Sequence, residues 1–254
     1  MTDLVELSNS KHRHLKLKIN CRIAFAATQY IIKIRVSEVA KSTTNFPVFF
    51  SRDHQNGLWV LSVLTHFNSG DNLFIDNQQW LSTYQPSSTQ TYPFYLMPSP
   101  NQKNSYTIGI IEDSDAFSDE QGEPLFDHDG KASSNLNRAK TLLEADINND
   151  IVTHQFSQKL EELNLLKAID LQIQYHDGSL HTLAGLHTID EDVLQQLSTK
   201  EMDELNKQGF LIPIHAMLIS LYQLNMLLRK YNDLTEFNKI KQLKIEVAKD
   251  MAAA

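Results

Sequence analysis

Hydrophobic residues in the first half of the chain fall into short runs that polar turns separate. Residues 46–50 and 58–67 are rich in Val, Phe, Trp and Leu, and the Asn-Gly pair between them suits the tight turn of a β-hairpin. Residues 92–97 and 106–111 form a second pair of such runs, joined by a polar connection. This pattern predicts a mainly antiparallel β structure over the first half.

The second half contains longer stretches in which apolar residues recur at helical spacing. Residues 136–149 and 151–166 are predicted to form two helices. Residues 171–175 alternate between apolar and polar positions, and an Asp-Gly turn leads to a return strand over 179–188. The chain is therefore predicted to have an α+β fold, in which the β structure of the first half packs with helices of the second half and a β-hairpin is inserted.

An apolar stretch follows at residues 210–228, which contain no Asp, Glu, Lys or Arg. Its length fits a membrane-spanning helix, but Pro213, His215 and Asn225 disrupt a helix or are costly at bilayer depth. We therefore predict a core helix over 214–231 and no membrane insertion. The residues expected to pack on the sheet are Leu218, Leu221, Leu224 and Leu228.

The C-terminal segment carries one apolar stripe at helical spacing, formed by Phe237, Ile240, Leu243, Val247 and Met251. The stripe predicts an amphipathic helix over 235–251. The expected organisation is thus a single α+β domain over residues 1–232 and a helical extension over 233–254. An exposed apolar stripe also makes a homo-oligomer one interpretation of this extension.

Composition narrows the classes of function. The 254 residues are 41% hydrophobic and 21% charged, which is typical of a globular protein. The closest two of its eight glycines, Gly178 and Gly185, stand seven positions apart. This spacing excludes the glycine-rich fingerprint of dinucleotide-binding folds, the P-loop and the nucleophile elbow. The lone Cys21 excludes an intramolecular disulfide, and the opening residues show no apolar leader, so a cytoplasmic location is expected.

The charge is distributed unevenly along the chain. The formal net charge is −8; residues 104–130 hold eight acidic residues and no Lys or Arg, whereas residues 7–37 hold seven Lys or Arg and no acid. We call residues 11–22 the basic arm and residues 112–129 the acidic loop, and we expect the two to pack together. The acidity of the whole chain argues against a nucleic-acid partner.

Several blocks of residues resemble those of the bacterial SapC family. They include Gly-Glu-Pro-Leu-Phe-Asp-His-Asp-Gly at 122–130, Phe-Ala-Ala at 25–27, Phe-Pro-Val-Phe at 46–49 and Asn-Leu-Phe-Ile-Asp at 72–76. The resemblance covers roughly residues 10–228, and many separate blocks occur in the family's order. Two arginines usual in the family before Tyr-Pro-Phe are replaced here by Thr and Gln at positions 89–91.

The resemblance implies a role more than a mechanism. The family is named for a component linked to export of S-layer protein, and its members are often encoded near halogenase-like flavoproteins and TonB-dependent receptors. No catalytic activity is established for the family. We therefore expect a non-catalytic accessory protein that binds another protein in the uptake, modification or export of surface material, without a cofactor or a metal.

The acidic loop carries the alternative. Asp127 and Asp129 lie in a segment that looks like a fragment of a calcium loop, although the glycine comes too early and no Glu closes it. Three interpretations are open: an Asp-Gly turn, a divalent-metal site that uses Asp127, Asp129, Glu123 or Asp113, and a contact surface for a basic partner. The alternative function is a metal-dependent hydrolase or oxygenase that uses residues 112–129 with His187 or His215.

Aromatic side chains supply the remaining candidates. Trp80 and Tyr84 are surrounded by turns, where they line a binding cleft or fill the core. The candidate ligand-binding residues are thus Trp80, Tyr84, Glu123, Asp127, Asp129, His187 and His215.

Overall fold

The computed structural model describes residues 4–53, 55–68, 70–100, 102, 105–234 and 238–248. The chain divides into two compact units whose segments alternate along the sequence. Unit 1 comprises Met1–Thr28, Ile75–Trp80 and Ser87–Asn148, and unit 2 comprises Gln29–Phe74, Leu81–Pro86 and Asn149–Ala254. A single domain over residues 1–232 stays a prediction.

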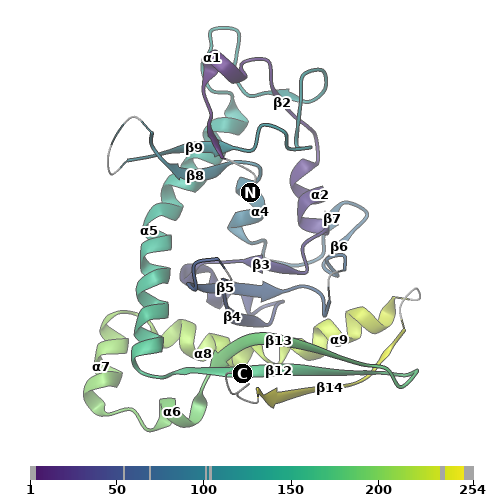
Figure 1. The fold of residues 1–254 in the computed structure, drawn as a ribbon, viewed down its shortest axis with the longest axis vertical. Helices are drawn as coiled ribbons and strands as arrows, with labels where there is room; N and C mark the ends of the chain where they lie inside the picture. Colours follow the sequence, from purple (N-terminus) through teal and green to yellow (C-terminus); the bar gives the residue numbers. More distant parts are fainter. Residues whose placement is uncertain are drawn as a thin grey trace. The chain divides into compact units, whose positions relative to one another are not determined.

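Unit 1 is built from short strands and helices (Figure 1). Its elements are β1 (Val5–Glu6), α1 (Asn9–His12), β2 (Lys16–Leu17), α2 (Cys21–Ala27), β6 (Ile75–Asp76), β7 (Gln79–Trp80), α4 (Ser87–Thr91), β8 (Tyr95–Pro98), β9 (Tyr106–Ile110), β10 (Phe117–Ser118), β11 (Glu123–Pro124) and the first half of α5 (Ser134–Glu162). The strands form small antiparallel sheets in the orders β1-β9-β8, β10-β2-β11 and β6-β7. The predicted pairing of 92–97 with 106–111 is confirmed as β8–β9.

Unit 2 contains a six-stranded antiparallel sheet in the order β14-β12-β13-β4-β5-β3 (Figure 1). Its elements are β3 (Ile31–Lys33), η1 (Val36–Glu38), α3 (Val39–Ser42), β4 (Val48–Arg52), β5 (Trp59–Leu64), the second half of α5, β12 (Leu166–Tyr175), β13 (Leu180–Ile189), α6 (Glu191–Gln195), α7 (Thr199–Lys207), α8 (Leu211–Ser220), α9 (Gln223–Asp233) and β14 (Ile240–Val247). Consecutive strand residues point to opposite faces, so burial of Val48, Phe49 and Phe50 shows that both faces of β4 are covered.

The α+β class is confirmed, and so are both predicted hairpins. β4 and β5 pair across the Asn-Gly turn, where Gly57 has a φ of 69°. β12 and β13 pair across the Asp-Gly turn, where Gly178 has a φ of 89°. Glycine reaches this left-handed region without the steric cost that a Cβ brings, which explains why these local signals are reliable.

Two helices expected over 136–149 and 151–166 are one helix, α5 (Ser134–Glu162). The two asparagines at its middle are poor helix formers, but neither lacks an N–H, so the ladder of hydrogen bonds continues through them. The helix ends four residues early because Asn164 adopts a φ of 53°. The backbone N–H of Leu165 then bonds the carbonyl of Leu160, which closes the helix terminus.

The expected helix over 214–231 is divided into α8 and α9. Ser220 Oγ donates to the carbonyl of Met217 at 2.6 Å and accepts from the backbone N–H of Val48 at 3.0 Å. The next two N–H groups, those of Leu221 and Tyr222, bond carbonyls three residues back, which is 3₁₀ geometry.

The expected packing of this segment on the sheet is largely wrong. Of the four leucines, only Leu224 is fully buried, whereas Leu218, Leu221 and Leu228 are half-buried. The buried stripe is formed instead by Ile214, Met217, Ser220, Leu224, Leu227 and Tyr231. The contact of Ser220 with β4 sets the rotation of the helices, and an apolar segment offers no polar face from which this rotation follows.

By length and composition, residues 211–233 could cross a membrane. They number 23, with a mean hydropathy of 1.6 over the most apolar window, of which 33% is buried. Core helices of soluble proteins meet the same criteria. The absence of membrane insertion stays a prediction.

The helix predicted over 235–251 is wrong for its described part, because residues 240–247 form strand β14. Phe237 and Met251 lie outside the described residues. Ile240, Leu243 and Val247 fit a helical stripe, but Leu243, Ile245 and Val247 fit the two-residue period of a strand equally well. The edge of β12 offers a row of ladder hydrogen bonds, and this tertiary partner decides for the strand.

Candidate functional site

The basic arm and the acidic loop pack together in unit 1, as predicted. Strand β2 of the arm lies between β10 and β11 of the loop, and Leu17 pairs with both Phe117 and Glu123. Alternation of Leu15, Leu17 and Ile19 along the arm predicts one buried strand face; Leu15 and Leu17 are buried, but Ile19 is 75% exposed. Backbone ladders and apolar burial therefore hold the arm, in addition to its charge.

A buried histidine contributes a polar contact to this packing. His12 lies 2% exposed in α1. Its Nδ1 accepts from the backbone N–H of Ser8 at 2.9 Å, so Nε2 is assigned the proton and donates to Glu112 Oε1 at 2.7 Å. Lys16 Nζ donates to the carbonyl of Glu120 at 2.9 Å. Carboxylates and carbonyls of the acidic loop thus bind the basic arm.

Within the segment 122–130, the chain leaves β11 and makes a tight turn over residues 127–131. Asp127 Oδ1 accepts from the backbone N–H groups of Lys131 at 2.8 Å and Asp129 at 2.9 Å. These bonds, that from Lys131 foremost, hold the pKa of the Asp127 carboxyl below its usual value. This segment therefore contains the Asp-Gly turn, and a metal site or a contact surface for a basic partner stays a prediction.

The turn also positions apolar residues on both sides of it. Leu125 is fully buried in the core of unit 1. Phe126 and Ala132, which flank the turn, face each other in an isolated antiparallel bridge. The turn therefore places Phe126 as a wall of an apolar groove.

This groove, which we call the unit 1 groove, has a volume of about 250 Å³. It lies among β8, β9, α5 and the turn, and its lining residues are Leu7, Leu96, Tyr106, Thr107, Ile108, Phe126, Ala132, Leu136, Lys140, Leu143, Glu144 and Ile147. Tyr106 is 56% exposed, and the exposed side chains of Lys140 and Glu144 pair at 3.8 Å. An apolar floor with a few polar groups at the rim is the usual build of a binding site.

Comparison with known proteins identifies the family. The SapC family profile matches residues 7–227. The chain belongs to the SapC family. The match includes the turn at 122–130 and every residue that lines the unit 1 groove. No curated protein and no solved structure matches the chain.

The residues of this SapC-family chain that were predicted to bind a ligand lie on separate elements. Asp127 and Asp129 share the turn, Glu123 is exposed on β11, and Trp80 is half-buried on β7. His215 is exposed on α8 of unit 2. A ligand-binding role for these residues stays a prediction.

Tyr84 of unit 2 has a structural contact. Its hydroxyl donates to Glu38 Oε1 at 2.5 Å, and Glu38 Oε2 accepts from the backbone N–H of Arg35 at 2.9 Å. Glu38 is buried, so these donors compensate the desolvation of its carboxylate. Among the described residues, no group of three or more His, Cys, Asp or Glu side chains has the geometry to hold a metal ion.

His187 belongs to an aromatic cluster on the sheet of unit 2. Its ring packs edge-on against Trp59, with centroids 4.7 Å apart, and Arg52 Cζ lies 3.6 Å from the centroid of the Trp59 ring. Burial lowers the pKa of His187 from its usual 6.5, and the positive charge of Arg52 lowers it further. A backbone hydrogen bond at Gly185 raises the pKa and only partly offsets these effects.

This shift predicts a pH dependence of stability. The folded state disfavours protonated His187, whereas in the unfolded chain this side chain has its usual pKa of 6.5. Below that pH the unfolded chain therefore binds more protons than the folded chain. Stability is therefore highest above this value and should fall as the pH drops from about 7 to about 5. Urea unfolding across this range measures the slope. His187→Gln should make the slope shallower, and an unchanged slope in this variant would contradict the assignment.

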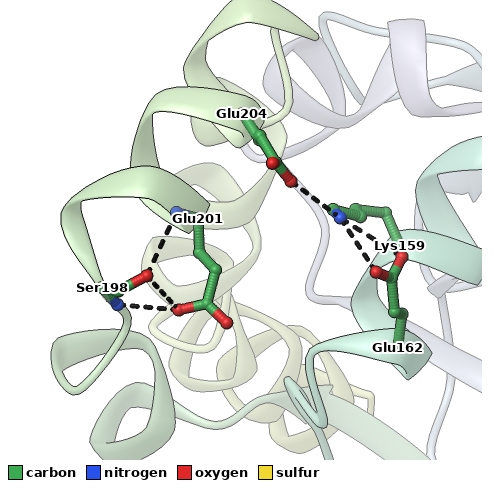
Figure 2. A network of polar contacts seen from close by, with 5 residues as sticks. All are labelled: Lys159, Glu162, Ser198, Glu201 and Glu204. Carbon is green, nitrogen blue, oxygen red and sulfur yellow. Dashed lines mark hydrogen bonds and ion pairs between the residues drawn. The ribbon is translucent and has the colours of Figure 1, made fainter.

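A polar cluster joins the end of α5 to α7 in unit 2. Figure 2 shows Lys159 between Glu162 and Glu204, and its Nζ lies 3.2 Å from a carboxylate oxygen of each. Beside it, Ser198 and Glu201 form a capping box at the start of α7, which the Ser-x-x-Glu spacing of the sequence predicts. A depression of about 520 Å³ nearby is lined by three Gln side chains, Val152, Phe210, Lys159 and Glu162. Its lysine is thus already paired with carboxylates of the same unit.

Sequence reasoning missed most of the unit 1 groove. Leu136 and Leu143 stand at helical spacing on α5, and Phe126 lies within the family block, so these three carried a signal. Leu96, Tyr106 and Ile108 lie on short strands, and nothing local shows that their side chains line the same surface as the helix.

Proposed function

We propose that this SapC-family protein is a non-catalytic accessory protein, and that the unit 1 groove binds an apolar side chain of a partner protein. The observation that carries the proposal is the groove itself, whose lining residues all lie within the part of the chain that matches the family. In the turn, the carboxylate of Asp127 accepts two backbone N–H groups, and Phe126 beside it forms a wall of the groove.

The size of the groove favours a side chain as its occupant. Pockets for small molecules typically measure about 300–1,000 Å³, whereas this groove measures about 250 Å³. A single large apolar side chain, anchored in such a pocket and surrounded by a polar rim, is the usual form of an interface hot spot. Exposed Tyr106 and the Lys140–Glu144 pair supply that rim.

The roles that the family resemblance implies support a proposal for the partner's place in the cell. We propose that it belongs to the uptake, modification or export of surface material, and that the complex forms in the cytoplasm. The acidic loop beside the groove favours a partner with positive charge near its apolar anchor.

Site-specific photo-crosslinking in the native host tests the proposal. A photoreactive p-benzoylphenylalanine at position 106 should yield an adduct with a host protein, which mass spectrometry then identifies. Ala132→Phe fills the groove and should abolish this adduct, while melting temperature shows that the variant folds. The same probe at exposed Leu58 of unit 2 is the control. An adduct that persists in Ala132→Phe, or no adduct beyond that at position 58, overturns the proposed function.

A further inference from the structure

Strand β14 stands at one end of the six-stranded sheet of unit 2, with β12 on its inner side. The backbone N–H of Ala248 donates to the carbonyl of Ala168 at 3.0 Å. In an antiparallel ladder alternate residues bond the same neighbour, so Lys244 and Glu246 also bond β12. Leu243, Ile245 and Val247 therefore direct their N–H and C=O groups toward the outer edge.

The same three residues extend the apolar face of the sheet. Leu243, Ile245 and Val247 stand opposite Ile173, Leu171 and Ile169 of β12. These three β12 side chains are buried, whereas Ile245 is 45% and Val247 63% exposed. The core face of the sheet thus continues onto β14 without a cover among the described residues.

An apolar groove of about 560 Å³ adjoins this edge, between β14 and the helices α8 and α9. Its lining residues are Glu191, Leu218, Ile219, Leu221, Tyr222, Leu224, Asn225, Leu228, Leu243 and Ile245. Ile219 and Tyr222 are largely exposed. A strand edge with unpaired backbone groups beside an apolar surface is a template for another strand.

We propose that this edge pairs with β14 of a second copy of the chain, antiparallel and with Ile245 opposite its own copy. The pairing makes the two sheets continuous about a two-fold axis. It places Leu243 opposite Val247 of the second copy, on the apolar face. On the other face it places Lys244 opposite Glu246 of the second copy, twice by symmetry.

Backbone geometry and charge select this register. Only registers that set odd-numbered residues opposite one another join the outward N–H and C=O groups. A shift by one residue of each strand sets Lys244 opposite Lys244, and the opposite shift sets Glu246 opposite Glu246. Directly opposed like charges destabilise a sheet, so the register centred on Ile245 is favoured over both neighbours.

A like-charge pair within the chain strengthens the case for a second copy. Glu246 stands directly opposite Asp170 of β12, and two carboxylates in this position repel each other. In the proposed register Lys244 of the second copy lies on the other side of Glu246. A strand of an unrelated protein supplies such a lysine only by coincidence, whereas β14 of this chain carries it.

Disulfide trapping tests the register. In a hydrogen-bonded antiparallel pair the Cα atoms are about 5.5 Å apart, which a disulfide spans. Ile245→Cys should therefore form a covalent dimer rapidly under mild oxidation. Lys244→Cys is the matched control, because its copies stand diagonally, about 7–8 Å apart, and should cross-link far more slowly. The wild-type chain, with only Cys21, shows the background.

Light scattering of the full chain tests the dimer without new cysteines. The wild type should show twice its 29.1 kDa. Glu246→Lys places a lysine opposite Lys244 of the second copy and should raise the dissociation constant of the dimer about tenfold. Adding Lys244→Glu should restore the original dissociation constant. Leu180→Asp alters an exposed apolar residue at the hairpin tip and should leave the mass unchanged.

Three results overturn the dimer: a 29.1 kDa mass at every soluble concentration, equal cross-linking of the two cysteine variants, or no rescue by the charge exchange. The inference concerns unit 2 and is independent of the partner proposed for unit 1. It replaces the C-terminal helix, which the sequence suggested as the oligomer contact, with the edge strand β14.

Discussion

Replacing Gly122 with Ala should lower the free energy of unfolding by about 3 kcal/mol or more. Gly122 has a φ of 118°, which L side chains rarely adopt. A Cβ there would lie 2.3 Å from the carbonyl oxygen of Leu17 and 2.7 Å from its carbonyl carbon. Both atoms belong to the backbone of β2, so the strand itself must shift, and the ladder between the basic arm and the acidic loop is lost with it.

Gly178→Ala is the matched control for this prediction. Gly178 also has a positive φ, 89°, but nothing lies within 4 Å of its added Cβ. The control therefore carries backbone strain alone, about 1–2 kcal/mol. Urea unfolding measures the loss of stability in both variants, and the difference between them gives the cost of the steric clash of the Gly122→Ala Cβ with the backbone of β2. Equal losses would show that Gly122 does not make the close approach to β2.

Phe156→Ala should destabilise unit 2 by about 3–5 kcal/mol. Phe156 is 0% exposed on the second half of α5. Its ring centroid lies 6.0 Å from that of Phe50 on β4 and 5.0 Å from that of Phe210 before α8. Truncation removes the ring that both neighbours contact and leaves a cavity, because β4 is held on both sides within the sheet and cannot collapse into the space.

The same helix supplies a control for Phe156→Ala. Ile151 is 52% exposed, so Ile151→Ala should change the free energy of unfolding by no more than about 0.5 kcal/mol. Phe156→Leu keeps most of the buried volume and should fall between the two. Thermal or urea unfolding gives the comparison. A loss for Phe156→Ala as small as that for Ile151→Ala would mean that this aromatic cluster does not form.

The elements predicted correctly from the sequence rest on local interactions. The Asn-Gly and Asp-Gly turns need a positive φ at one residue, and glycine provides it wherever the rest of the chain lies. The capping box of α7 closes within four residues, from Ser198 to Glu201. Such signals act over a few positions, so the order of residues is sufficient to read them.

The packing of the basic arm on the acidic loop was also predicted, although they are far apart in sequence. The basic arm carries no acidic residue and the acidic loop carries no Lys or Arg, and this opposite charge predicted that the two segments pack together. The contacts that form are nevertheless β2 ladders, burial of Leu17 and the bond from His12 to Glu112. Charge pattern predicted which segments meet, and backbone geometry decided how.

Other features depended on tertiary partners that no local pattern specifies. Ile240, Leu243 and Val247 suit a helix or a strand, and the edge of β12 decided for a strand. The rotation of α8 and α9 was set by the hydrogen bond from Val48 of β4 to Ser220 of α8. The unit 1 groove arose where β8 and β9 meet α5 and Phe126. The amino-acid sequence by itself determined the fold class, the turns and the family; the strand edge and the grooves were decided by the tertiary structure, because each requires surfaces from segments whose approach depends on the packing of the whole unit.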